Sequence, residues 1–232
     1  MRSTLLPAAA ALYLSNPGVD EHTLHHRGGG SACTISTPHG DFWLTCEHVL
    51  TGMQRAQKKK PDSLLVGTLN MWPLCLDPIE VISSNEEWDI AVFRAPQAHN
   101  AIQPPSSWIP RWFKPKFPLE KPQPGDQVVI FGFPGEGRLE GRQDHVFIFA
   151  MVNDVTDRKC VLMPNEPRAV SNSHSRLLRA DSGMGGISGG PVFLLRDGVP
   201  SLCALVSNGE RADGFIMASL LYRLHPDGRL LV

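Results

Sequence analysis

The sequence predicts an all-β protein, and three observations lead to that expectation. First, the 232 residues include 21 glycines and 20 prolines, well above the usual share of about 12% for these two turn-forming residues. Second, short runs rich in β-branched or aromatic residues recur along the chain, with turn residues between them. Third, only the tail Ser219–His225 has residues at helical spacing. The chain also has no repeat of fixed period and no apolar run long enough to span a bilayer, which argues against a solenoid and a membrane-spanning helix. Many short strands are therefore expected rather than long helices.

The composition is that of a folded protein. Hydrophobic residues make up 42% of the chain and charged residues 19%, which excludes disorder of the whole chain. The formal net charge of -1 gives no bulk attraction to polyanions. We therefore expect neither nucleic acid nor a membrane as a partner.

The strands are expected in two sets. The first set begins with Ala10–Asn16, closed by the turn dipeptide Asn16-Pro17. It continues with Ser31–Ser36, Phe42–Thr45, Leu64–Leu69, Ile79–Ile82 and Ile90–Phe93. The second set comprises Gln127–Phe131, His145–Val152, Val192–Leu195, Leu202–Ser207 and Phe215–Ala218. A short helix is expected only at Ser219–His225, where three leucines have helical spacing.

A connector, Pro96–Pro124, separates the two sets. It contains eight prolines interleaved with aromatic residues. The segment is too apolar for a free linker and too rich in proline for a helix or a central strand. We expect it to lie as a strap across two barrels, one formed by each set of strands.

The cysteines indicate a reducing compartment. There are five, an odd number, with no C-x-x-C pair, and this favours free thiols over a disulfide framework. The cytoplasm is the expected location. The alternative is a secreted or periplasmic protein if residues 1–15 act as a signal, because Leu5–Leu14 is a short apolar run behind Arg2. Pro7 interrupts that run, and no small-residue cleavage site follows it.

The most informative stretch is Gly185–Pro191, which holds Ser188 among glycines and precedes the strand Val192–Leu195. Glycine lets the backbone bring amide N–H groups close to an incoming carbonyl, as stabilisation of an oxyanion requires. A serine is a poor nucleophile without a base and a carboxylate that orients the base. The sequence must therefore supply a histidine and an acid.

Two residues have suitable settings. His48 follows the strand Phe42–Thr45, and Asp89 opens the apolar strand Ile90–Phe93. The patterns Leu-Thr-x-x-His-Val, Asp-Ile-Ala-Val and Gly-x-Ser-Gly-Gly-Pro, in this order, resemble the chymotrypsin-like (trypsin-like) serine peptidases. The gaps agree with the family, with 41 residues from His48 to Asp89 and 99 from Asp89 to Ser188. The resemblance covers nearly the whole chain.

The resemblance implies a fold and its division. The fold would be two antiparallel six-stranded β-barrels with a short C-terminal helix. Residues 1–95 would form the first barrel, 96–124 the connector and 125–232 the second barrel, together one peptidase domain. Gly30-Ser31-Ala32 also looks like the family's Gly-Ser-Gly or Gly-Ser-Ala opening, and Pro124–Val128 like the first strand of its second barrel.

The resemblance also implies a serine endopeptidase that hydrolyses peptide bonds in proteins through an acyl-enzyme. Ser188 would be the nucleophile, His48 the base and Asp89 the group that orients it, while the N–H groups of Gly186 and Ser188 would form the oxyanion hole. The partners would be protein or peptide substrates, with room for a regulatory protein. No cofactor and no metal are implied.

The substrate-binding residues implied by the resemblance are Ser182, Gly183, Ser207, Gly209 and Gly214. Val206–Gly209 would pair with the substrate chain as an added strand. Ser182 would form the floor of an uncharged primary pocket suited to a large apolar side chain. A shift of one residue would place Asp181 there instead and favour arginine or lysine. Both specificities stay open.

Two departures separate the chain from animal digestive enzymes. Ile187 stands where those enzymes have an aspartate that grips a newly cut N-terminal amine, so activation by that route is not expected. The family's usual disulfide positions, here Leu50 and Met184 among them, carry no cysteine. The chain thus looks closer to intracellular and bacterial members.

Two other classes of protein share parts of these motifs. A silent peptidase-fold module that binds peptides or partner proteins would keep the same motifs. Gly186-x-Ser188-x-Gly190 also fits the nucleophile elbow of α/β-hydrolases, with Asp213 and His225 completing a triad. That elbow must open a helix, however, and the residues after Ser188 are poor helix formers.

The remaining clusters of histidine, cysteine and basic residues are interpreted as structural or solvent-exposed. Neither the histidines at positions 22, 25 and 26 nor the group Cys33, Cys46 and His48 has zinc-site spacing. The basic run Lys58–Lys60, with Arg55, is interpreted as a solvated loop.

Overall fold

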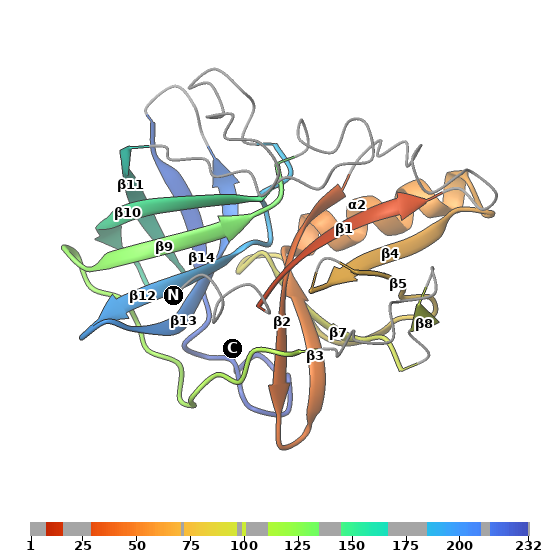
Figure 1. Cartoon of the computed structure of the whole chain (residues 1–232), viewed down its shortest axis with the longest axis horizontal. Coiled ribbons are helices and arrows are strands. Elements are labelled where there is room, and N and C mark those ends of the chain that lie inside the picture. Colours follow the sequence, from red (N-terminus) through yellow and green to blue (C-terminus); the bar gives the residue numbers. More distant parts are fainter. Residues whose placement is uncertain are drawn as a thin grey trace.

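The computed structural model describes residues 8–15, 29–70, 72–96, 99–100, 111–134, 145–166, 185–209 and 214–231. Two β-units lie next to each other, an eight-stranded sheet from the first half of the chain and a closed six-stranded barrel from the second (Figure 1). The predicted all-β class and its chymotrypsin-like architecture are confirmed. Over the described residues the first unit is a sheet of eight strands rather than the expected closed barrel of six, and short strands extend it at one edge.

The first sheet has the order β6-β7-β3-β2-β1-β4-β5-β8 and pairs its neighbours antiparallel. Its strands are β1 (Ala9–Ser15), β2 (Gly29–Thr37), β3 (Gly40–Thr45), β4 (Leu64–Leu69), β5 (Trp72–Cys75), β6 (Glu80–Asn85), β7 (Ile90–Arg94) and β8 (His99–Asn100). Along β1 the buried residues alternate between two cores, as the two-residue period of a strand dictates. Tyr13 belongs to the large core that continues into the barrel, and Leu12 to a smaller core under the helix.

Helix α2 (Glu47–Lys59) covers the smaller core. Its buried residues Val49, Leu50 and Met53 pack there, while the basic residues of its last turn face solvent. Positive charge at a helix C-terminus is favourable because the helix dipole is negative there. The interpretation of Arg55 and Lys58–Lys60 as a loop was therefore wrong, although these cationic residues are exposed as expected.

The second unit closes on itself. Its strands are β9 (Gln127–Gly132), β10 (Val146–Val155), β11 (Lys159–Glu166), β12 (Pro191–Arg196), β13 (Val199–Gly209) and β14 (Ile216–Leu220). Closure comes from β9, which pairs with β10 on one side and β12 on the other. Of these six strands, only β11 has no counterpart in the sequence analysis.

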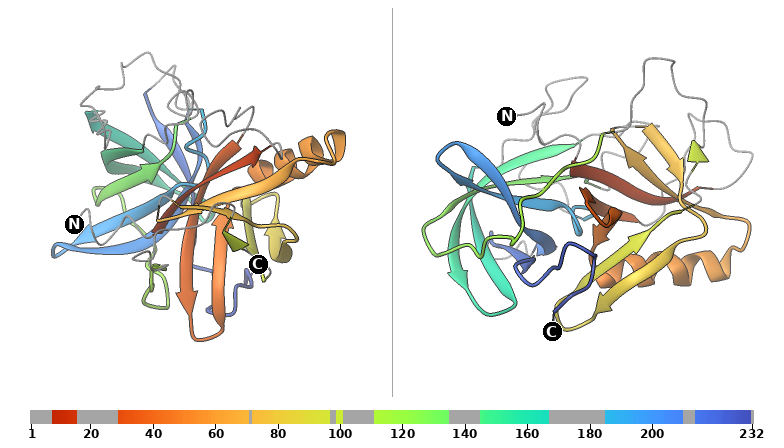
Figure 2. Two further views of the ribbon diagram at one scale, coloured as in Figure 1. Left: turned by 45° about the vertical axis from the view of Figure 1, so that its right-hand side comes forward. Right: turned by 90° about the horizontal axis from the view of Figure 1, so that it is seen from below.

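The predicted helix at Ser219–His225 is wrong. Ser219 and Leu220 continue β14, because Ser219 pairs with Lys159 on β11 and with Leu205 on β13. The chain then turns, and Leu224 forms an isolated bridge with Leu230. Sheet pairing thus overrides the helical spacing of the leucines, and the tail folds back towards the first sheet (Figure 2).

The described part of the connector, residues 111–124, joins the two units. Phe113 exchanges backbone hydrogen bonds with β2, donating to Thr34 O at 3.2 Å and accepting from Ser36 N at 2.7 Å. Its ring packs edge-on against Phe193 of β12, with the ring centres 5.2 Å apart. Over this part the connector contacts both units, as the expected strap would, while Trp108 lies outside the described residues.

All five cysteines are buried and free, as the odd count predicted. Burial raises the pKa of the Cys160 thiol to about 12. Among the described residues, no helix has the length and apolar character needed to cross a membrane.

The contact between connector and barrel predicts a stability loss for Phe193→Ala. Phe193 is fully buried against Phe113, so truncation should lower the free energy of unfolding by about 3–5 kcal/mol. Urea denaturation followed by circular dichroism measures this. Val199 is 64% exposed, and Val199→Ala should change stability by less than about 0.5 kcal/mol. A loss below about 1 kcal/mol in Phe193→Ala would contradict the packing described here.

Candidate active site

Asp89 and His48 form a close pair at the start of α2. His48 Nδ1 lies 2.9 Å from both Asp89 carboxylate oxygens. The backbone N–H of His48 donates a further hydrogen bond to Asp89 Oδ1 at 3.1 Å. The carboxylate therefore holds the imidazole at two places, through its ring and through its backbone.

The position of Asp89 follows from its turn and from the helix opposite. It ends the turn that leads into β7, with φ +52°, a left-handed conformation that aspartate tolerates better than most residues. Cys46, the N-cap of α2, makes no side-chain capping bond. The Asp89 carboxylate takes over that task at the positive end of the helix, where an anion is favoured.

The pair shifts the titration of both groups. The hydrogen bond that His48 donates to the Asp89 carboxylate raises the pKa of His48 above its ordinary value of 6.5, although partial burial opposes this. Burial tends to raise the pKa of Asp89, but the hydrogen bonds from His48 outweigh it and hold this pKa below its usual range. With Nδ1–H donated to the carboxylate, Nε2 is the ring nitrogen able to accept a proton.

The buried Cys46 thiol lies beneath this pair. It donates to Val206 O at 2.9 Å, and burial together with the negative charge of Asp89 raises its pKa well above the ordinary range. One atom each from Cys46, His48 and Asp89 lie within 4.8 Å of one another, close enough to hold a metal ion. The hydrogen bonds described above already engage all three. Cys33, grouped with Cys46 and His48 in the sequence analysis, is not part of this cluster, and the histidines at 22, 25 and 26 lie outside the described residues.

Ser188 sits on a loop that is pressed against β2. Its carbonyl accepts a hydrogen bond from Ser31 N at 2.7 Å. A Cβ atom on Gly189 would collide with Ser31 O and Thr45 Oγ1, and one on Gly190 would collide with Phe131 O. Gly186 and Gly189 also have φ +94° and +88°, which side chains disfavour. The glycines in the motif are thus required by close approach and by backbone conformation.

The Ser31 side chain fixes the same loop. Its hydroxyl is buried, donates to Gly186 O at 2.8 Å and accepts from Phe133 N at 2.9 Å. Thr45 Oγ1 in turn donates to Ser31 O at 2.7 Å. The loop carrying Ser188 is thereby joined to β2 of the first sheet and to the chain that follows β9 of the barrel.

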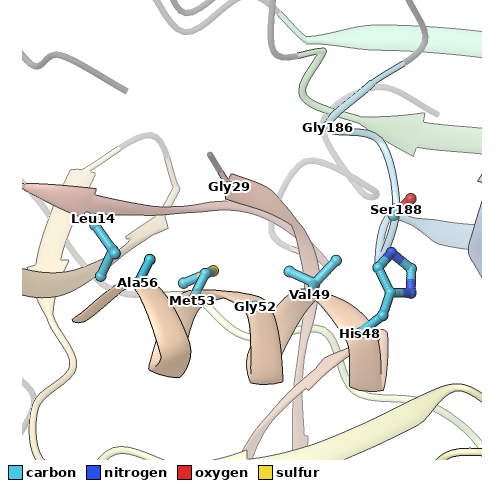
Figure 3. Close-up of a pocket in the computed structure, with 9 residues that line it drawn as sticks. All are labelled: Leu14, Gly29, His48, Val49, Gly52, Met53, Ala56, Gly186 and Ser188. Carbon is cyan, nitrogen blue, oxygen red and sulfur yellow. The ribbon is translucent and has the colours of Figure 1, made fainter. Parts of the chain in front are cut away.

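Ser188 and His48 face the same cavity, which has a volume of about 330 Å³ (Figure 3). Within the described residues no hydrogen bond joins Ser188 Oγ to the His48 ring. The hydroxyl instead donates to Ser207 O at 3.4 Å. Rotation about one side-chain torsion moves this oxygen, and catalytic hydrogen bonds are often long or unformed before substrate binds.

The family model for the trypsin-like peptidase domain matches residues 30–200, well over half of the chain. The chain belongs to the trypsin-like peptidase family. A comparison with curated proteins finds none that matches. The matched region includes all three motifs in which the resemblance was noted.

Only some of the residues expected to bind substrate lie within the described part of the chain. Ser182 and Gly183 lie outside the described residues, as does Asp181, so neither primary-pocket alternative is decided. The Ser207 hydroxyl is buried and has no partner among the described residues. Gly209 ends β13, and Gly214 is exposed.

Sequence reasoning missed several contributors to the site of this peptidase. The sequence assigns Ser31 only to an opening motif, and Cys46 only to a group with Cys33 and His48 that lacks zinc-site spacing. Helix α2 was also missed, although Val49, Met53 and Ala56 have the spacing of one helix face. That periodicity was the available signal, whereas the contacts of Ser31 and Cys46 depend on residues distant in the chain.

The Asp89 contact predicts that the His48 imidazole has a pKa above 6.5, and that Asp89→Asn lowers it because the anionic acceptor is lost. Proton–nitrogen NMR of the imidazoles across pH 4–9 measures both values, with His48→Gln used to assign the signal. An equal pKa for His48 in wild type and variant would contradict the pairing.

Proposed function

We propose that this trypsin-like protein is a serine endopeptidase that hydrolyses peptide bonds through an acyl-enzyme. The observation that supports this best is the convergence of the Asp89–His48 pair and Ser188 at one cavity, from opposite halves of the chain. The arrangement corresponds to nucleophile, base and orienting acid. The substrates are proteins or peptides.

The mechanism follows from these roles. Ser188 Oγ attacks the scissile carbonyl while His48 Nε2 takes the hydroxyl proton. Asp89 stabilises the imidazolium through Nδ1–H. The N–H groups of Gly186 and Ser188 bind the oxyanion, each contributing about 3–4 kcal/mol of transition-state stabilisation. His48 then gives its proton to the leaving amine, and water attacks the acyl-enzyme in the same way.

The loop contacts support the oxyanion role of Gly186 and Ser188. The backbone N–H of Gly190 donates to Ile187 O at 2.8 Å and thus fixes the peptide group between Ile187 and Ser188, which carries the Ser188 N–H. Ser31 Oγ donates to Gly186 O and holds the preceding peptide group of the same loop. A preorganised donor costs no rearrangement during reaction. Ile187 is fully buried, and its apolar side chain would stabilise this loop without the salt bridge that an aspartate supplies in digestive enzymes.

The alternative is a silent module that binds peptides or partner proteins without turnover. The contact of Ser188 Oγ with Ser207 O, in place of His48, favours it. A regulatory partner that reorients the hydroxyl would reconcile the two candidates, because the change required is a side-chain rotation.

A fluorophosphonate probe separates these candidates. The peptidase should be labelled stoichiometrically at Ser188, since the probe phosphonylates a serine activated by its base. Ser188→Ala should not be labelled and should lose about 10⁶-fold in kcat for peptide hydrolysis. Intact-protein mass spectrometry measures the labelling, with Ser201→Ala as a control that keeps it. Wild type that stays unlabelled between pH 6 and 9, with peptides present, would favour the binding module.

The pH profile of kcat/KM tests the role of His48. Activity should rise as the imidazole loses its proton, with a midpoint above 6.5 because the hydrogen bond to the Asp89 carboxylate favours the charged form of His48. Asp89→Asn should move the midpoint down and lower the maximal rate by about 10⁴-fold. Initial rates on a fluorogenic peptide between pH 5 and 9 give the profile. A flat profile over this range would exclude His48 as the base.

A further inference from the structure

The cavity beside the catalytic pair continues along one face of α2. Val49, Gly52, Met53 and Ala56 line it at positions that share a helix face, and Leu14 of β1 lies opposite (Figure 3). From His48 to Ala56 this face is about 12 Å long at the rise of an α-helix. Apart from the His48 end, its side chains are apolar.

Gly52 keeps this groove open. A Cβ atom at this position would meet nothing within 4 Å, and Gly52 lines the cavity. Glycine inside a helix is unfavourable by about 1 kcal/mol relative to alanine. The conformation gives no reason for glycine here, because residue 52 lies within the regular helix and has no positive φ. The missing side chain instead adds depth to the groove.

The groove lies on the leaving-group side of the scissile bond. His48 delivers the proton to the leaving amine, and α2 carries His48. The acyl part of a substrate would instead pair with β13. No described residue of β13 lines this cavity. A peptide leaving Ser188 past His48 therefore enters the groove of α2.

We propose that this groove is a specificity site for large apolar side chains at the first two positions after the scissile bond. The inference rests on the proposed peptidase function and adds a substrate class to it. The volume of about 330 Å³ lies within the range of ligand pockets, about 300–1,000 Å³. Val49 and Met53 are buried at 7% and 4% exposure and provide a firm apolar floor.

Partitioning of the acyl-enzyme tests the groove directly. Ser188 Oγ attacks a peptide methyl ester, the acyl–oxygen bond forms and methanol leaves. An added amine then attacks the same carbonyl in competition with water. His48 accepts the proton of the amine, an amide bond forms, and the proton passes to Ser188 Oγ as its bond to the acyl group breaks. The ratio of amide to acid product reports how well the amine occupies the leaving-group side.

The amines are leucinamide and alanyl-leucinamide, compared with glycinamide and alanyl-glycinamide. The esters end in phenylalanine or arginine, to suit both primary-pocket alternatives, and Ser188→Ala provides the uncatalysed background. Burial of a leucine side chain should raise the amide-to-acid ratio about 10-fold or more in at least one pair. If the amide-to-acid ratios for the leucine amine and the matching glycine amine agree within 2-fold in both pairs, the groove proposal is overturned, even where the acyl-enzyme forms.

Two variants at Gly52 sharpen the test. Gly52→Leu fills the groove and should bring the preference for leucine below about 2-fold. Gly52→Glu should also lose it and should favour lysinamide over leucinamide, a reversal that misfolding would not produce. Lys58→Leu and Lys58→Glu are matched controls, because Lys58 is exposed on the same helix and does not line the cavity. They should keep the wild-type ratios.

Failures of the two proposals remain distinguishable. If neither acid nor amide forms above the Ser188→Ala background, the peptidase function is overturned and the groove proposal with it. If the acyl-enzyme forms and the Gly52 variants retain the leucine preference, only the groove is overturned. The ratio compares two fates of one intermediate, so a loss of total activity in a variant does not affect this conclusion.

Discussion

The close packing of the Ser188 loop on strand β2 is the constraint on which the site depends. Ser188 belongs to the second half of the chain, whereas His48 and Asp89 belong to the first. Their relative placement is fixed by the hydrogen bond from Ser31 N to Ser188 O and by the contacts of the Ser31 hydroxyl. Glycine at position 189 permits the approach, because any side chain there would meet the backbone of Ser31.

The side chains of the site are held to different degrees. Asp89 binds both the ring and the backbone of His48, so the same carboxylate orients the imidazole and caps the N-terminus of α2. The Ser188 hydroxyl is less constrained, and its hydrogen bond to Ser207 O is 3.4 Å long. The backbone of the site is thus held in place, while the Ser188 oxygen keeps a torsional freedom that a substrate or a partner could use in the proposed reaction.

In the proposed mechanism, helix α2 connects the chemistry to the binding of the leaving group. Its first turn carries His48, and the face that continues from it lines the cavity. The same helix packs on the smaller core through Leu50 and Met53. Anchoring in a packed core keeps base and groove in a fixed relation, as precise positioning of reacting groups requires.

Much of this protein could be predicted from local sequence. Short runs rich in β-branched or aromatic residues, with turn residues between them, predicted most strands. The ordered motifs around His48, Asp89 and Ser188 indicated the family and its expected triad. Where the local sequence pattern predicted the wrong element, tertiary contacts outweighed local propensity. The leucines after Ser219 have helical spacing, yet pairing with Lys159 and Leu205 makes Ser219 part of a strand.

The detailed geometry of the site was decided by tertiary structure alone. The contact between Ser31 and Gly186 joins residues 155 positions apart, and that between Cys46 and Val206 joins residues 160 apart. No local periodicity encodes such distances. The open space at Gly52 is likewise defined by neighbouring elements rather than by the glycine itself. Sequence determined which chemical groups were available, whereas the packing of the two halves determined which of them meet, because hydrogen bonds and steric fit act over a few ångströms and disregard separation along the chain.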